Sequence, residues 1–208
     1  MHNRIGHRFQ RRLDVPVWLE RGPQEAAPIP FSFSQQIAAG ADDVFAKTDG
    51  FFSAVVQPTC CDDGGGILAE GGFRYDGVAI PVGATIFTAR LHIIAKFNAA
   101  GGVAEAKFQC ANEDDSAAFV SNADFYGRPL TAAQVNWSMP DMVTGIGYDT
   151  PDLTTIIQEV VDRVGWAQGN AMNFFWLDNG SGAGIKRFAE HFETNPLGTA
   201  ELFVTGEA

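Results

Sequence analysis

The sequence predicts a mainly β protein whose strands form an antiparallel β-sandwich capped by one α-helix. Several segments alternate apolar and polar residues with the period of two that is typical of a strand with one buried face. The 208 residues include 17 Phe and 23 Gly, a composition that favours an aromatic core and many tight turns. One segment, about residues 151–164, carries an apolar stripe at helical spacing. A hydrophobic content of 46% and a charged content of 19% exclude a disordered or fibrous protein.

The chain divides into an extended arm over residues 1–30 and a single β-sandwich domain over residues 31–208. Residues 1–21 hold five arginines against two carboxylates, a net charge of +3, whereas the remainder carries −14 of the total of −11. The prolines between residues 16 and 30 favour an extended path. A solvated tail is the ordinary fate of such a segment, and a docking arm is the sharper alternative. In the second case the docking residues are Arg4, Arg8, Arg11, Arg12 and Trp18.

The first half of the domain is predicted to contain strands at residues 31–37 and 51–56, followed by a turn-rich loop over residues 57–72. The clearest strand covers residues 85–97, because its apolar residues fall on one face and its polar residues on the other. The predicted inward residues are Phe87, Ala89, Leu91, Ile93, Ala95 and Phe97.

Residues 103–110 repeat this alternation, and the Gly-containing turn at residues 99–102 predicts a hairpin between the two strands. In the second of these strands Ala104, Ala106, Phe108 and Cys110 are predicted to face inward. The remaining predicted strands lie at 171–177, 185–192 and 199–205.

One helix is predicted over about residues 151–164. Thr150 is a suitable N-cap, Pro151 suits the first helical position, and Gly165 suits the end. The stripe consists mainly of β-branched residues, so we expect packing onto a sheet, rather than helix propensity, to stabilise it. Its members are Leu153, Ile156, Ile157, Val160, Val161 and Val164.

The three cysteines do not form a pattern typical of a secreted disulfide framework or of a zinc site. The adjacent pair Cys60 and Cys61 could bond to each other only with strain. Cys110 lies on the apolar side of its strand, where a plain buried thiol is expected. We therefore expect the chain to fold in a reducing cytoplasm.

A series of short motifs in the domain has a recognisable order. The series resembles the DNRLRE-type and carbohydrate-binding-module-like jelly-roll modules of bacterial extracellular and phage structural proteins, and it covers about residues 40–205. The resemblance implies a jelly-roll β-sandwich used for adhesion, glycan contact or assembly, and it implies no catalytic residues. The motifs are FRYDGVAIPVGATI at 73–86 with Ala89 and Leu91, RPLT at 128–131 with Val135 and Trp137, TPDL at 150–153, GWAQGNA at 165–171, and Pro196-Leu197.

No nucleophile, zinc-protease or phosphate-loop motif is present, so we expect a protein that is not an enzyme and has no catalytic, cofactor-binding or metal-binding residues. His92 and His191 are expected at the surface. Calcium is conceivable at the acidic clusters 42–43, 62–63 and 113–115, but their spacing is not that of a calcium loop, and solvated acidic loops are the default.

Three aromatic residues form a candidate sugar-stacking platform, if their rings are exposed. The alternative for each ring is core packing, which is the commoner fate of aromatic residues in a Phe-rich sandwich. The three residues are Phe125, Tyr126 and Tyr148.

Two functions follow as hypotheses. The first is a structural protein of a virus particle, such as a head-decoration, tail or fibre component of a tailed phage, which assembles in the host cytoplasm. Its partners would be other virion proteins in a homo-oligomeric or symmetric assembly. The alternative is an extracellular carbohydrate-binding or adhesion module, and the two overlap if a virion module holds host-surface glycans. The net charge of −11 argues against nucleic acid as a partner, and the lack of an apolar run of about 20 residues argues against membrane insertion.

Overall fold

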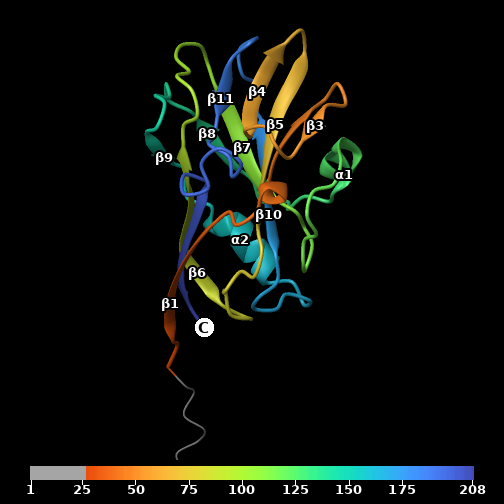
Figure 1. Cartoon of the computed structure of the whole chain (residues 1–208). Helices are drawn as coiled ribbons and strands as arrows, with labels where there is room; N and C mark the ends of the chain where they lie inside the picture. Colours follow the sequence, from red (N-terminus) through yellow and green to blue (C-terminus); the bar gives the residue numbers. More distant parts are fainter. Residues whose placement is uncertain (1–26) are drawn as a thin grey trace, which may run out of the picture.

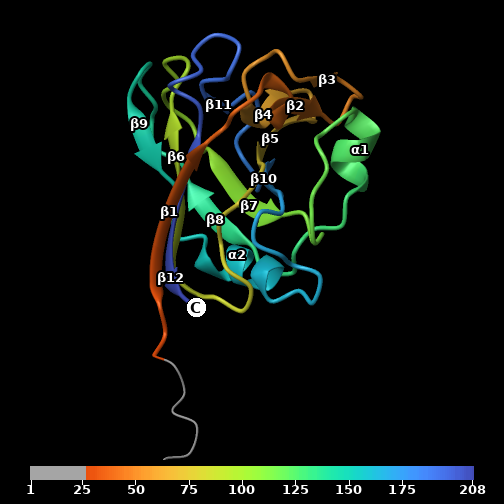
Figure 2. The ribbon, with the colours of Figure 1, turned by 60° about the horizontal axis from the view of Figure 1, so that its bottom comes forward.

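The computed structural model describes residues 27–208, which form two antiparallel sheets that face each other (Figures 1 and 2). The predominance of strands and the two short α-helices confirm the predicted mainly β sandwich. Within the described residues no helix is both long enough and apolar enough to cross a membrane. The predicted docking residues Arg4, Arg8, Arg11, Arg12 and Trp18 lie outside the described part of the chain.

The smaller sheet has four strands in the order β1-β12-β6-β9. These strands are β1 (Pro30–Gln36), β6 (Thr85–Ile94), β9 (Gly147–Asp149) and β12 (Glu201–Glu207). Just before β1, Ile29 and Ala208 exchange both backbone hydrogen bonds, at 2.8 and 3.0 Å, which extends the β1–β12 ladder by one more pair.

The larger sheet has the main order β11-β4-β5-β10-β7-β8, with β2 paired to β5 and to β3. Its strands are β2 (Asp43–Lys47), β3 (Phe52–Ser53), β4 (Thr59–Gly64), β5 (Ile67–Tyr75), β7 (Glu105–Cys110), β8 (Val135–Ser138), β10 (Met172–Asp178) and β11 (Lys186–Phe188).

The strand order is that of a jelly roll. Eight strands carry the pattern, namely β1, β5, β6, β7, β8, β9, β10 and β12. If these eight strands are numbered from 1 to 8 in chain order, the smaller sheet has the order 1-8-3-6 (β1-β12-β6-β9). The corresponding part of the larger sheet has the order 2-7-4-5 (β5-β10-β7-β8). This interleaving of two sheets by crossing connections is the double Greek key of jelly rolls.

The main core between the sheets is aromatic. The rings of Phe108 and Trp176 stack in parallel with their centres 6.3 Å apart, and Trp137 lies 6.1 Å from Phe108. The buried Tyr75 hydroxyl on β5 donates to the backbone oxygen of Ala200, next to β12, at 3.1 Å. This bond satisfies the phenol and joins the two sheets.

All three cysteines are free and buried. Cys110 faces the main core from β7, which confirms the predicted buried thiol.

Helix α2 (Thr154–Val161) lies at one end of the sandwich and contacts β6 and β7 (Figure 1). Its apolar side is buried as predicted, but the helix is shorter than predicted, and Val164 lies beyond its end and is fully exposed. Thr150 is not the N-cap, because its hydroxyl accepts the N–H of Leu91 instead. The carboxylate of Asp152 binds both the N–H and the hydroxyl of Thr154 at the start of the helix.

The predicted loop over residues 57–72 is wrong. The segment forms the hairpin of β4 and β5, which turns at Gly64–Gly66, where all three glycines have positive φ. Its high content of glycine and aspartate resembled that of a loop, although glycine occurs in sheets at tight turns and close approaches. The predicted strand at 51–56 shrinks to Phe52–Ser53.

Two residues that were predicted to face inward from the strand at 85–97 are exposed. Thr88 pairs with Thr205 and Ile86 with Gly206, so Phe87 is the extra residue of a β-bulge. A bulge shifts the alternation by one residue, and Phe87 is 52% exposed while Ile86 is buried. Phe97, also predicted inward, lies beyond the end of the strand and is 44% exposed.

The predicted hairpin at residues 99–102 is also wrong. β6 belongs to the smaller sheet and β7 to the larger, so the connection between them crosses from one sheet to the other. Alternation identified both strands and most of their buried residues, but it carries no information about pairing partners.

Candidate binding site beside helix α1

A second, smaller apolar cluster lies on the outer face of the larger sheet. The segment 111–131, which includes helix α1 (Asn122–Gly127), covers this face (Figure 2). The cluster consists of Val44, Ala46, Ala111, Phe119, Phe125, Phe175 and Leu177. The sequence analysis did not predict α1, although Ser121 caps it by accepting the N–H of Asp124 at 3.1 Å. The Ser-x-x-acid spacing at residues 121–124 is the signal that could have identified it.

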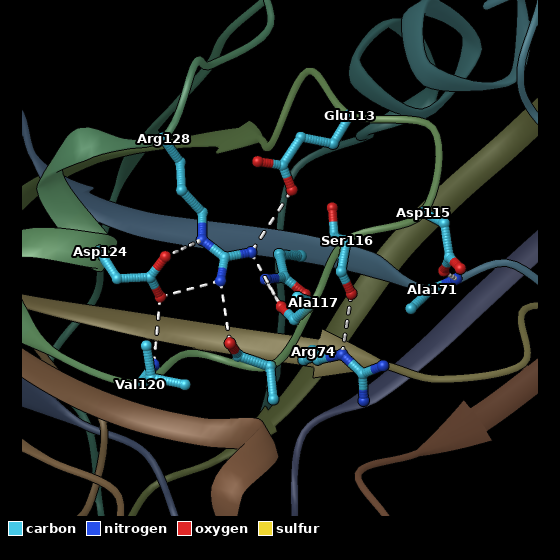
Figure 3. A network of polar contacts seen from close by, with 11 residues as sticks. Arg74, Glu113, Asp115, Ser116, Ala117, Val120, Asp124, Arg128 and Ala171 are labelled. Atoms are coloured by element: carbon cyan, nitrogen blue, oxygen red, sulfur yellow. Dashed lines mark hydrogen bonds and ion pairs between the residues drawn. The ribbon is translucent and has the colours of Figure 1, made fainter.

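Arg128 holds the covering segment together (Figure 3). Its guanidinium donates to the backbone oxygens of Ala117 and Ala118 at 2.8 and 2.9 Å, and it forms an ion pair with Asp124 at 2.8 Å. The guanidinium also lies 5.0 Å from the centre of the Phe119 ring, and the side chain is only 6% exposed. The guanidinium therefore satisfies both loop carbonyls and the carboxylate with donors in a fixed planar fork, a geometry that the lysine ammonium lacks.

Arg74 attaches the same segment to β5 (Figure 3). Its Nε donates to the Ser116 oxygen at 3.0 Å, and its other nitrogens bind Asp42 and Asp76, each at 3.0 Å. On the other side of the segment, Asp115 accepts the N–H of Ala171 at 2.7 Å. These bonds anchor the segment to the sheet at several points, so helix α1 has a defined position on the sandwich.

A pocket of about 320 Å³ opens between α1 and the larger sheet. It falls in the usual range for small-molecule sites, about 300–1,000 Å³, and combines apolar and charged side chains. Its lining residues are Thr48, Leu68, Glu70, Lys107, Phe125, Tyr126, Arg128, Leu130, Phe175, Leu177 and Asp178.

Glu70 and Tyr126 form the polar centre of this pocket. Burial of Glu70 raises the pKa of its carboxyl group, while the hydrogen bond from the Tyr126 phenol and the N–H of Asp178 oppose that rise. Burial and the negative charge of Glu70 raise the pKa of Tyr126, so the phenol stays protonated beside the carboxylate. Lys107 adds a positive charge to the same pocket.

The structure brings two of the three predicted aromatic residues together. Tyr126 lines the pocket and is 41% exposed. Phe125 is only 2% exposed and packs against Phe119 and Phe175, so its expected exposure is wrong and the core alternative holds. Tyr148 lies on β9 in the other sheet, where its hydroxyl accepts the N–H of Val143 at 2.9 Å. The three rings therefore do not form one platform.

The acidic clusters are used within the fold. Asp62 accepts the backbone N–H of Gly64 and of Gly184, and Asp63 pairs with Lys47 and Lys186. In residues 27–208 no group of three or more His, Cys, Asp or Glu side chains is arranged to hold a metal ion.

The two histidines of the domain differ in exposure. His92 is partly exposed on the smaller sheet and bonds to Asp149 at 2.7 Å. His191, which was expected at the surface, is only 4% exposed, and burial together with Lys96 lowers its pKa.

No known protein family matches the sequence, and no curated protein matches it. Among solved structures, a chain from one titled Desmodium yellow mottle tymovirus is 8% identical, and the match covers 89% of each chain at a TM-score of 0.29. A TM-score this low does not establish a shared fold. The jelly-roll assignment therefore rests on the strand order.

Proposed function

We propose that this chain is a non-enzymatic structural protein of a virus particle, such as a head-decoration, tail or fibre component of a tailed phage. In this proposal the basic N-terminal arm docks onto other virion proteins and the β-sandwich is displayed outward. The observation that carries the proposal is the jelly-roll strand order, because jelly rolls are a common architecture of viral capsid domains as well as of lectins.

The position of β1 supports an arm that reaches a partner. β1 is an edge strand of the smaller sheet and pairs with β12 on one side. An edge strand presents unpaired backbone N–H and C=O groups, which a strand of another subunit can join. The chain therefore enters the domain at a sheet edge that is suited to subunit contact.

The outer face of the smaller sheet suits a surface exposed to water. Its side chains bond to one another across strands: Thr88 to Thr205 at 2.7 Å, and the guanidinium of Arg90 over the ring of Phe203 at 4.4 Å. Neither helix covers this face (Figure 2). Cross-strand pairs of this kind are typical of an antiparallel sheet with one solvated face.

The test is mass spectrometry of virus particles that are banded on a density gradient from the source of this chain. We expect the chain in the particle band at a constant ratio to the major shell protein. Its absence from the particles, together with a purified chain that is monomeric and binds no particle component, would overturn the proposal.

The pocket beside α1 favours glycan binding as a second function, with Tyr126 as the residue on which a sugar ring stacks. An exposed tyrosine ring next to a buried carboxyl and a lysine provides an apolar face together with partners for sugar hydroxyls. On a glycan array, with and without calcium, we expect wild type and Tyr126→Phe to bind and Tyr126→Ala to lose binding. Tyr148→Ala on β9 is the matched control. No bound glycan, or equal binding by Tyr126→Ala, rejects this function.

A further inference from the structure

Two adjacent cysteines of β4 have both side chains in the core. In a regular strand, neighbouring side chains point to opposite faces of the sheet. Here Cys60 and Cys61 are both 0% exposed, and their Sγ atoms lie 3.2 Å apart. That distance is shorter than the optimal separation of even two carbon atoms, about 3.5–4.0 Å, and sulfur is the larger atom.

The backbone at Cys61 explains this arrangement. Cys61 has φ of +100°, and among residues 27–208 it is the one residue other than glycine with a positive φ. This conformation is rare for L-residues and turns the Cys61 side chain to the same side as that of Cys60. Nothing in the proposed function requires it.

A disulfide between adjacent residues normally meets a geometric obstacle. Neighbouring Cα atoms are about 3.8 Å apart, whereas disulfides usually join Cα atoms about 4.4–6.8 Å apart, so the backbone must distort before the sulfurs can bond. In β4 the backbone already departs from the regular strand, and the two sulfurs already touch.

We propose that Cys60 and Cys61 are a reversible dithiol–disulfide pair that closes a small ring through their shared peptide bond. The oxidant is a small-molecule disulfide such as oxidised glutathione. One cysteine thiolate attacks a sulfur of the oxidant and releases one thiolate, and the neighbouring cysteine then displaces the second. Two protein thiols are oxidised, one external disulfide is reduced, and the two protons pass to the released thiols.

The fold provides one route to these sulfurs. β4 lies between β5 and β11, and β11 is a three-residue strand at the edge of the larger sheet. Arg187 of β11 pairs directly with Cys60, and Lys186 pairs with Cys61. Both thiols are fully buried, and burial raises the pKa of the Cys60 thiol, so exchange requires a local opening of the sheet, and the short edge strand β11 is the element that we propose opens.

The test is a thiol count on the full chain, equilibrated in buffers of reduced and oxidised glutathione, then denatured and alkylated with N-ethylmaleimide. The reduced chain should take up one adduct on each of its 3 cysteines. In oxidising buffer we expect two adducts to be lost, and a peptide carrying Cys60 and Cys61 that is lighter by two hydrogen atoms. The matched control is Cys110→Ser, which should still lose two N-ethylmaleimide adducts in oxidising buffer.

A second measurement separates this fold from ordinary dithiol chemistry. The same equilibrium is measured for the chain unfolded in guanidinium, where the pair is not held together. We expect the native chain to form the disulfide with the larger equilibrium constant. An equal or smaller native constant overturns the proposal. So do full retention of the adducts, a stable glutathione adduct, or a disulfide that involves Cys110 or a second chain.

Discussion

Gly72 controls how closely the segment that carries α1 can approach the larger sheet. A Cβ atom at this position would lie 2.8 Å from a methyl group of Val44 and 2.9 Å from the ring of Phe119. Both neighbours belong to the cluster beneath α1, and packed interiors of this kind leave no room for an added methyl group. The requirement for glycine at this strand position is therefore steric.

We predict that Gly72→Ala destabilises the protein by about 1–3 kcal/mol, because the added methyl group displaces Phe119 or Val44. The measurement is equilibrium unfolding in urea. The matched control is Gly127→Ala at the end of α1, where a Cβ meets nothing within 4 Å. Equal stability of the two variants would contradict the steric argument.

Asp43 is a buried acid on the first residue of β2. It is 1% exposed; its Oδ2 accepts the N–H of Phe192 at 2.8 Å, and its Oδ1 has no partner. Burial, together with the nearby negative charges of Glu193 and Asp42, raises its pKa from 3.8 to about 7. The folded state therefore holds this proton more tightly than the unfolded state does.

We predict a pH-dependent difference between wild type and Asp43→Asn. Between the unfolded pKa of 3.8 and the folded pKa of about 7, only the unfolded chain loses this proton, so wild type loses stability as the pH rises. The asparagine variant should gain up to about 4 kcal/mol relative to wild type from pH 4 to 8. Urea unfolding across this range measures the gain, with Asp76→Asn as the exposed control. A difference that does not vary with pH would show that Asp43 titrates normally.

At the residue scale the sequence predicted most inward positions but not the exceptions. Alternation identified Leu91, Ile93 and Phe108 as buried, and all three are. It failed at Phe87, because a bulge depends on the pairing with Gly206 far along the chain. No side-chain direction was predicted for Cys61, because its segment was predicted as a loop, and the positive φ there depends on the fold.

At the scale of elements, α2 shows what periodicity can and cannot predict. The stripe from Leu153 to Val161 is buried as predicted, because helical spacing alone determines which residues share a face. The predicted start was wrong because Thr150 and Asp152 bind backbone groups of β6, contacts that join residues about 60 positions apart. The β4–β5 hairpin of the larger sheet was missed for a similar reason, because only the pairing of the two strands identifies it.

We predict that Ile157→Ala costs about 2–5 kcal/mol, because it leaves a cavity between α2 and the sheets. Val164→Ala should change the stability by no more than about 0.5 kcal/mol, because Val164 is fully exposed. Thermal and urea unfolding of the two variants would test the position of the helix end. A large loss for Val164→Ala would place it within the packed stripe after all.

The segment that carries α1 depends on Arg128. We predict that Arg128→Lys costs about 3 kcal/mol, since it leaves the oxygens of Ala117 and Ala118 without their bidentate donor. Hydrogen exchange should rise across residues 111–128 and stay unchanged in β10. Arg90→Lys on the exposed face of the smaller sheet is the control, and uniform exchange across the whole domain would contradict a local anchor.

At the scale of the whole molecule, the charge is divided between two parts. Residues 1–21 carry +3 and the remainder carries −14, so the proposed arm and the displayed body have opposite signs. Both this division of charge and the sandwich class could be predicted from the sequence alone. It could not give the pocket beside α1, because Glu70, Lys107 and Tyr126 come from three separate segments that only the fold brings together.

We predict that binding of the chain to virus particles weakens with salt. Raising the ionic strength from about 0.1 M to about 1 M shortens the screening length from about 10 Å to about 3 Å, which weakens contacts of exposed arginines. Replacing Arg4, Arg8, Arg11 and Arg12 together by glutamine should weaken binding and flatten the salt dependence in co-sedimentation. Arg90→Gln in the body is the control. Binding that is unaffected by the fourfold replacement would exclude these arginines from docking.

The backbone hydrogen bonds between Ile29 and Ala208 determine where a foreign polypeptide can be attached to this sandwich. A polypeptide fused after Ala208 would emerge beside Ile29, where the chain enters β1. The Gly64–Gly66 turn between β4 and β5 lies at the opposite end of the sandwich (Figure 1). A Cβ atom added at any of these three glycines would meet nothing within 4 Å. An epitope inserted there would be presented at the far tip of the sandwich, away from Ile29 and Ala208.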